Sequence, residues 1–101
     1  MIKTIQEKQI ILTLTDGLTA NKISSYSEQL GELLPVSEQY DTCILDLAQT
    51  TNIDSAGVTF VINLYKRMKA SEKTFSVIGA DDDVQNLFRL MKLDRFFDMK
   101  N

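Results

Sequence analysis

The chain has 101 residues, which is the size of one small domain with a single hydrophobic core. Hydrophobic residues make up 44% and charged residues 25%, so the composition is that of a folded globular protein rather than a disordered segment. The formal net charge of −3 argues against nucleic acid as the main partner, because binding to phosphates needs clustered Lys and Arg.

The chain also has no histidine to serve as a catalytic base and no recognisable set of metal ligands. It has one cysteine, Cys43, which lies in an apolar run and is expected to be buried and unpaired. No apolar stretch approaches the ~20 residues of a membrane span, and the N-terminal segment lacks the pattern of a signal peptide. We therefore expect a cytoplasmic protein that is not an enzyme, uses no metal or cofactor and does not insert into membranes.

The first half of the chain predicts two strands, a helix and a third strand. Apolar residues alternate over 10–14, which is the period of a strand, and a weaker strand covers 2–5 with a turn at Glu7-Lys8 between them. Helical spacing follows over 21–34, where Thr19 or Asn21 can cap the helix start and Pro35 marks the end. The continuous apolar run over 43–47 is typical of a central strand covered on both faces.

The second half predicts a helix over 56–70, a strand over 74–79 and a third helix that Asp81, Asp82 and Asp83 open. Residues 93–99 follow as a short strand or a packed tail, in which Phe96 and Phe97 are expected to belong to the core. The three aspartates are predicted to complement the helix dipole rather than to bind a cation. Alternation of strands and helices predicts a single α/β domain over 1–101, with a mixed central sheet of four or five strands and packed helices.

The stretch Asp54-Ser55-Ala56-Gly57 places a hydroxyl at the start of the second predicted helix. A helix N-terminus presents unpaired N–H groups and the positive end of the helix dipole, so it tolerates a phosphate well. Asp and Ser are also favoured N-cap residues, so the stretch can simply be a helix cap. The two interpretations are compatible, because a capping serine can also be modified.

The order of elements and two segments resemble a STAS domain, most in the style of the free-standing bacterial anti-sigma factor antagonists. The specific segments are Ile53–Gly57 and the sequence RLMKLDRFF over Arg89–Phe97, and the resemblance extends from Ile10 to Met99. It implies that Ser55 is phosphorylated by a serine kinase that is also the anti-sigma factor. The unphosphorylated form then binds this kinase and frees the sigma factor, phosphorylation breaks the complex, and a serine phosphatase resets the switch.

One segment departs from the family pattern. A Gly-x-Leu-Asp sequence commonly follows the second strand in that family, with its aspartate near the phosphorylated serine. Here the matching residues are Asp16-Gly17-Leu18-Thr19, so a threonine occupies the aspartate position. Thr19 can cap the first helix but supplies no carboxylate, which leaves Asp54 as the nearest acid to Ser55.

The expected partner-binding face comprises the loop over 16–21, the turn before Ser55 and the outward side of the following helix. We expect Phe60 to lie near the edge of that helix's apolar face as an exposed aromatic anchor. The predicted partner-binding residues are Asp16, Thr19, Asn21, Asp54, Ala56, Gly57, Thr59, Phe60 and Asn63.

The sequence leaves two other classes of function open. The chain can be a non-switching STAS scaffold subunit of a lipid-transport or stress-signalling assembly, in which Ser55 need not be phosphorylated. A nucleotide-binding domain is disfavoured, because the four glycines are dispersed and form no Walker or Rossmann pattern. We expect the free protein to be a monomer.

Overall fold

The computed structural model describes residues 1–34 and 39–100, so the helix end predicted at Pro35 lies outside the described residues. Each predicted element is present in the described part of the chain, with bounds that differ by a few residues at most. The elements are β1 (Ile2–Gln6), β2 (Gln9–Thr13), α1 (Ala20–Leu33), β3 (Thr42–Asp46), α2 (Ser55–Ala70), β4 (Thr74–Ile78), α3 (Asp82–Leu90), the 3₁₀ helix η1 (Leu93–Arg95) and β5 (Asp98–Lys100).

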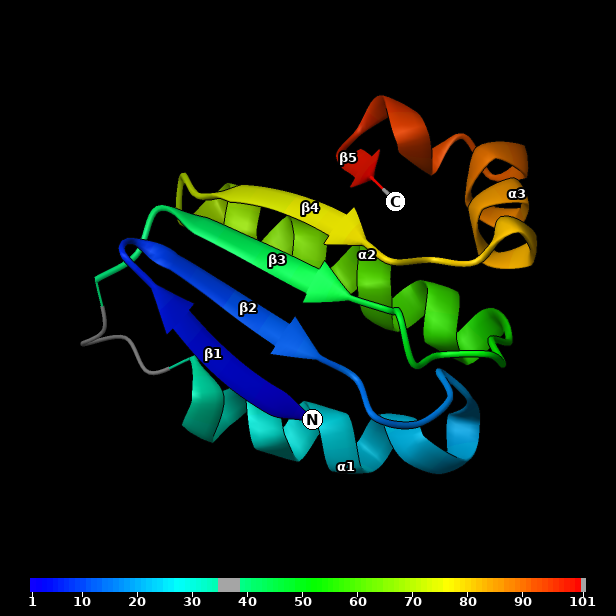
Figure 1. The fold of residues 1–101 in the computed structure, drawn as a ribbon, viewed down its shortest axis with the longest axis horizontal. Coiled ribbons are helices and arrows are strands. Elements are labelled where there is room, and N and C mark those ends of the chain that lie inside the picture. The colour runs from blue at the N-terminus through cyan, green and yellow to red at the C-terminus, as the bar shows by residue number, and fades with distance from the viewer. Residues whose placement is uncertain (35–38, 101) are drawn as a thin grey trace.

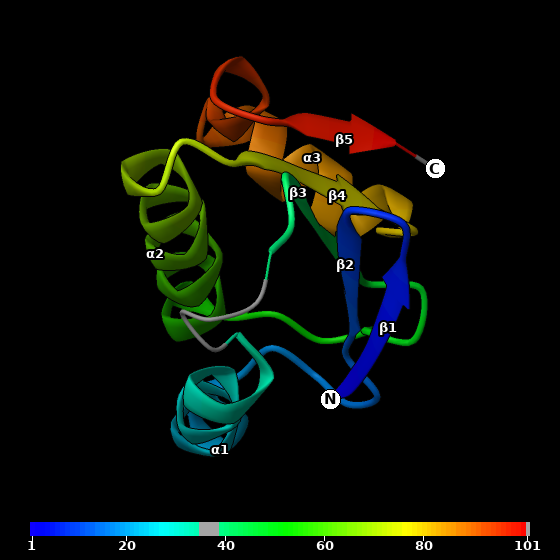
Figure 2. The ribbon, with the colours of Figure 1, turned by 90° about the vertical axis from the view of Figure 1, so that its left-hand side faces the viewer.

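The strands form one sheet in the order β1-β2-β3-β4-β5. β1 and β2 form an antiparallel hairpin, whereas β2, β3, β4 and β5 pair in parallel. The predicted mixed sheet is therefore confirmed. α1 and α2 cross over between parallel strands and lie on the same side of the sheet, while α3 lies beyond the end of β4 (Figures 1 and 2).

The two faces of the sheet differ in burial. In β3, Cys43 and Leu45 are completely buried beneath the helices, but Ile44 and Asp46 on the other face are only half-buried. The expectation that this strand is covered on both faces is therefore wrong for one face. The physical reason is that both crossover helices pack on the same side, which leaves the opposite face partly open (Figure 2).

An aromatic cluster joins the C-terminal segment to the core. The Phe97 ring lies 5.1 Å from the Phe75 ring centroid and 5.7 Å from that of Tyr65, and Phe97 is buried. The core position predicted for Phe97 is confirmed. The same prediction is wrong for Phe96, which is 57% exposed, because the tail turns after η1 and directs successive side chains to opposite sides.

The acidic run at the start of α3 behaves as a helix terminus. The Asp81 carboxylate accepts a hydrogen bond from the Val84 N–H at 2.9 Å, and Asp82 and Asp83 occupy the first turn. In residues 1–34 and 39–100, no three acidic, His or Cys side chains are grouped closely enough to hold a metal ion. No helix in that part of the chain is long and apolar enough to cross a bilayer.

Candidate functional site

The loop after β2 and the loop after β3 lie together at one edge of the sheet. Leu18 and Ile53 form an isolated parallel bridge between them. The Leu18 N–H donates to the Asn52 carbonyl at 2.8 Å, and the Asp54 N–H donates to the Leu18 carbonyl at 3.1 Å. Because parallel neighbouring strands end at the same edge, the segment over 16–21 and the turn before Ser55 lie side by side on one surface.

The Asp54 carboxylate caps two helices at once. One oxygen accepts a hydrogen bond from the Gly57 N–H of α2 at 2.9 Å, and the other accepts from the Ala20 N–H of α1 at 3.0 Å. These backbone donors, Ala20 first and then Gly57, hold the pKa of the Asp54 carboxyl below its usual range. The charge therefore stays on Asp54 at neutral pH and bridges the N-termini of α1 and α2.

Thr19 does not have the role expected of it. It occupies the N-cap position of α1, but its side chain makes no capping hydrogen bond. The carboxylate that caps α1 comes instead from Asp54, which is 34 residues away along the chain from Ala20. The acid missing from position 19 is thus supplied from the neighbouring loop.

Ser55 is the first residue of α2 and is exposed. Its backbone carbonyl accepts a hydrogen bond from the Thr59 hydroxyl at 3.0 Å, within the first turn of the helix. Ser55 thus lies exposed where the two loops meet, and it directly follows the ionised Asp54 in the chain. This geometry leaves the serine accessible to another protein.

Gly57 allows α2 to approach the neighbouring loop closely. A Cβ atom built on Gly57 would lie only 2.0 Å from the Leu18 carbonyl oxygen and 2.8 Å from the Leu18 carbonyl carbon. A side chain at this position would push the helix away from the loop. Gly57 is itself buried, so its contribution to the site is to set the position of Ser55 rather than to form an exposed surface.

Asp16 and Asn21 remain on the surface at the other side of the site. The Asp16 carboxylate lies 2.9 Å from the Lys22 ammonium and accepts a hydrogen bond from the Gly17 N–H. The hydrogen bond from Lys22 is the main reason that the pKa of Asp16 is lowered. The Tyr26 hydroxyl donates to the Gly17 carbonyl at 3.2 Å and so ties α1 to this loop.

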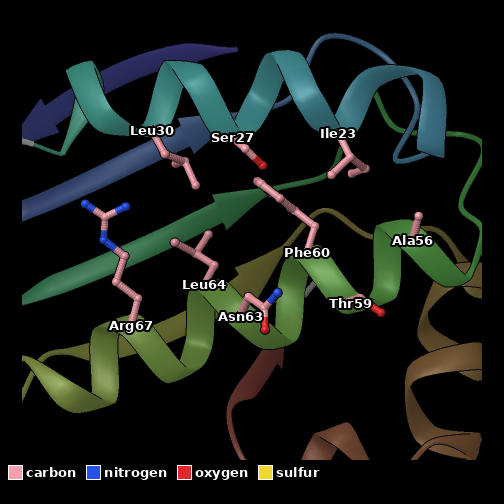
Figure 3. A pocket seen from close by; sticks show the side chains of 9 residues that line it. All are labelled: Ile23, Ser27, Leu30, Ala56, Thr59, Phe60, Asn63, Leu64 and Arg67. Carbon is pink, nitrogen blue, oxygen red and sulfur yellow. The ribbon is translucent and has the colours of Figure 1, made fainter.

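A groove of about 460 Å³ runs between α1 and α2 from Ala56 to Arg67 (Figure 3). Thr59 and Asn63 are exposed along it, whereas Phe60 is only 5% exposed and extends from α2 toward α1 (Figure 3). The Phe60 ring lies 5.9 Å from the Tyr26 ring. The expectation of an exposed aromatic anchor is therefore wrong, because α1 covers this side of α2 and makes Phe60 part of the groove floor.

The α1 wall of the groove was not predicted from the sequence. It consists of Ile23, Ser27 and Leu30, which follow the spacing of one helix face. That spacing shows which residues of α1 share a face, but it does not show which helix they meet. The wall forms only because the crossover connection places α1 beside α2.

Solved structures of the same fold include proteins with different roles. A Thermotoga maritima protein assigned as an anti-sigma factor antagonist matches with a TM-score of 0.89 and 19% identity, covering 99% of this chain and 85% of that one. The unphosphorylated anti-sigma factor antagonist SpoIIAA matches with a TM-score of 0.73 and 12% identity, covering 97% and 84%. A chain of the stressosome, a signal integration and transduction hub, matches with a TM-score of 0.76 and 14% identity, covering 98% and 86%.

At these identities the structural likeness shows the fold alone, and the family assignment rests on the sequence. The family described as "Mlab, STAS domain" matches residues 2–99, which is nearly the whole chain. The protein therefore belongs to the STAS domain family.

Proposed function

We propose that the protein is an anti-sigma factor antagonist whose switch is phosphorylation of Ser55. The observation that carries this proposal is the position of an exposed Ser55 at the first turn of α2, on a surface built from two loops. In the unphosphorylated form, this surface binds a serine kinase that is also the anti-sigma factor, and the sigma factor is released. A serine phosphatase restores the binding form.

The charge of the phosphate explains how binding is lost. A phosphate on Ser55 adds about −1.5 to −2 charges at neutral pH, next to the Asp54 carboxylate that already occupies the nearby N–H of Gly57. An interface that closes over a neutral hydroxyl has no group positioned to compensate this charge, but the phosphate must still be desolvated when the interface forms. A loss of about 3 kcal/mol for this reason weakens binding by roughly two decades.

The test has two parts. Phosphopeptide mass spectrometry on protein from its native cells, grown under several conditions, is expected to find phosphate at Ser55 in amounts that vary with condition. The kinase that co-purifies with the wild type is then titrated with the Ser55→Asp variant, for which we expect binding at least 100-fold weaker. Ser24→Asp is the matched control, because Ser24 is also exposed near the start of a helix, α1, but lies outside the proposed phosphorylation site.

Two results would contradict the proposal. One is consistent absence of phosphate from a well-observed Ser55 peptide. The other is a Ser55→Asp variant that folds like the wild type and binds the kinase equally well. Loss of binding in both serine variants would indicate a general effect of added negative charge rather than a switch at Ser55.

A second candidate is a non-switching subunit of a larger assembly, and the likeness to a stressosome chain favours it. In that case the same loop surface is a permanent contact and Ser55 acts only as the first residue of α2. We then expect stable co-purification with the assembly in the absence of any kinase, under every growth condition.

A further inference from the structure

A second hollow lies beside α2, separate from the groove that α2 forms with α1. It has a volume of about 160 Å³ and an apolar wall. α2 and the segment around η1 supply its lining, which consists of Ile62, Tyr65, Lys66, Leu93, Phe96 and Phe97. We call this hollow the η1 pocket.

The η1 pocket and the serine site are on different parts of α2. At about 100° per residue, Ile62 is turned about 200° from Phe60, so the pocket lies on the side of α2 away from the α1 groove. Ile62 is also seven residues beyond Ser55, which corresponds to about 10 Å along the helix axis. A partner can therefore occupy the η1 pocket without covering the serine.

The rim of the pocket exposes an aromatic side chain to solvent. Phe96 is 57% exposed. Its ring lies 5.9 Å from the ring of Tyr65 in α2, so Tyr65 covers part of the Phe96 ring. Lys92 has a left-handed backbone conformation with φ of 61°, which turns the chain back after α3 and brings η1 against α2. Folding thus leaves an apolar ring half covered at a concave site, as at a docking surface.

Three cations lie in or beside the pocket, although the protein as a whole is acidic. Lys66 lines the pocket, the Lys69 ammonium lies 5.9 Å from the centre of the Tyr65 ring, and Arg95 is exposed in η1. Two exposed acids also adjoin lining residues in the chain: Asp94 follows Leu93, and Asp98 follows Phe97. In the described part of the chain, no carboxylate forms an ion pair with any of these three cations. Their charges are available to a partner.

We propose that the η1 pocket binds an acidic amphipathic segment of a partner protein, with one apolar side chain of that segment inserted beside Phe96. The concave apolar wall accepts an anchor residue, and the cations of the rim complement acidic residues around it. A membrane surface is a poorer occupant, because adsorption to anionic lipids usually takes a cluster of four to eight cations. This inference goes beyond the serine switch and does not depend on it.

The test uses a defined probe and the whole protein. The ¹⁵N-labelled protein is titrated with an 18-residue helical peptide that carries Leu and Phe on one face and Glu on the other. We expect backbone shifts concentrated at Ile62, Lys66 and Phe96, with a dissociation constant in the micromolar range. The same peptide with Lys in place of Glu is expected to bind at least tenfold more weakly. The Ser55→Asp variant is expected to bind the Glu peptide as the wild type does.

Two variants and their controls identify the pocket. Phe96→Ser is expected to lower the affinity for the Glu peptide at least tenfold. Ile5→Ser, which alters a side chain on β1 that is 54% exposed, is expected to leave this affinity unchanged. Lys66→Glu keeps the aromatic rim and is also expected to weaken binding, and Lys8→Glu makes the same charge change at the exposed β1–β2 turn. Loss in both Phe96→Ser and Lys66→Glu, with both controls intact, supports the proposal.

The remaining outcomes overturn it. Shifts confined to other residues, or no shifts at millimolar peptide, remove the pocket as a peptide site. Equal binding of the Glu and Lys peptides removes charge complementarity. Tight binding to phosphatidylglycerol vesicles without peptide binding would show that the occupant of the pocket is a membrane. Loss of the NMR signals of the pocket residues when the protein alone is concentrated would show that the occupant is a second copy of the chain.

Discussion

Asp54 connects three parts of the site, two through its carboxylate and one through its backbone N–H. It caps α2 through Gly57 and α1 through Ala20, and its backbone N–H bonds to the Leu18 carbonyl. These contacts fix where both helices begin relative to the loops. Loss of the charge should therefore loosen the whole site rather than one helix end.

We expect Asp54→Asn to lower the melting temperature at neutral pH and to change its dependence on acid. The pKa of Asp54 is lowered in the folded state, mainly by the Ala20 N–H and then by that of Gly57. The stabilisation of the folded state by the Asp54 carboxylate is thus fully present above the ordinary pKa of about 4 and is lost as the pH falls through the lower pKa of the folded state. Thermal denaturation from pH 7 to pH 2 should show a shallower acid decline in the variant.

Asp16→Asn is the control for this prediction. Asp16 also has a lowered pKa, but the cause is the exposed Lys22 partner and the effect is screened by salt. We expect a smaller drop in melting temperature for this variant, and one that disappears in high salt. An acid decline in Asp54→Asn identical to that of the wild type would show that the carboxylate does not stabilise the helix starts.

Gly57 and Gly31 form a matched pair, because both are glycines within helices. At Gly57 a Cβ atom would overlap the Leu18 carbonyl, and we expect Gly57→Ala to lower the free energy of unfolding by about 3 kcal/mol. At Gly31 nothing lies within 4 Å of such an atom, so Gly31→Ala should raise it by up to about 1 kcal/mol. Urea denaturation of both variants measures this difference, and equal effects would contradict the close approach at Leu18.

At the scale of elements, aromatic packing holds η1 and β5 to the molecule together with the pairing of β5 with β4. The buried Phe97 ring contacts the rings of Phe75 and Phe88, at centroid distances of 5.1 Å and 6.4 Å. We expect Phe97→Ala to cost about 3–5 kcal/mol of unfolding free energy, as is usual for a buried Phe. Phe96→Ala should cost about 1 kcal/mol or less, because that ring is mostly exposed. Similar losses for the two variants in urea denaturation would contradict these positions.

The helices and strands could be predicted from the sequence because their signals are local. The spacing of Val58, Val61 and Leu64 indicates a helix with one buried face wherever that helix lies, and Asp54 is an N-cap by residue type alone. The pairing of elements is not local. The sequence therefore did not show that Asp54 also caps α1, or that α1 covers Phe60.

The same distinction explains the errors in the strands and the tail. The apolar run of β3 has the composition of a strand covered on both faces, but coverage depends on which side the crossover helices take. Adjacent phenylalanines in the tail look alike in the sequence, and only the turn that follows η1 decides that Phe97 is buried and Phe96 exposed. The serine at the helix start was visible because its signal, a cap followed by a glycine, is contained in four residues.

For the whole molecule, Cys43 reports how firmly the sheet is held together. It lies in β3, in the middle of the sheet, where it is completely buried, and burial raises the pKa of its thiol to about 12. Because the thiolate is the reactive form, the native protein should react with a thiol reagent at pH 8 only through opening of the core. We expect labelling at least 1,000-fold slower than in denaturant, where the thiol reacts fully.

The rate of Cys43 labelling also tests whether a charge at Ser55 changes the fold. α2 packs over the buried face on which Cys43 lies, so an added charge that unfolded the start of α2 and loosened its packing would expose the thiol. If Ser55→Asp alters only the surface, its labelling rate should stay within about threefold of the wild type, whereas Gly57→Ala should accelerate labelling in proportion to its loss of stability. A Ser55→Asp protein that labels as fast as Gly57→Ala would mean that charge at the serine acts by opening the core rather than by local repulsion at the interface.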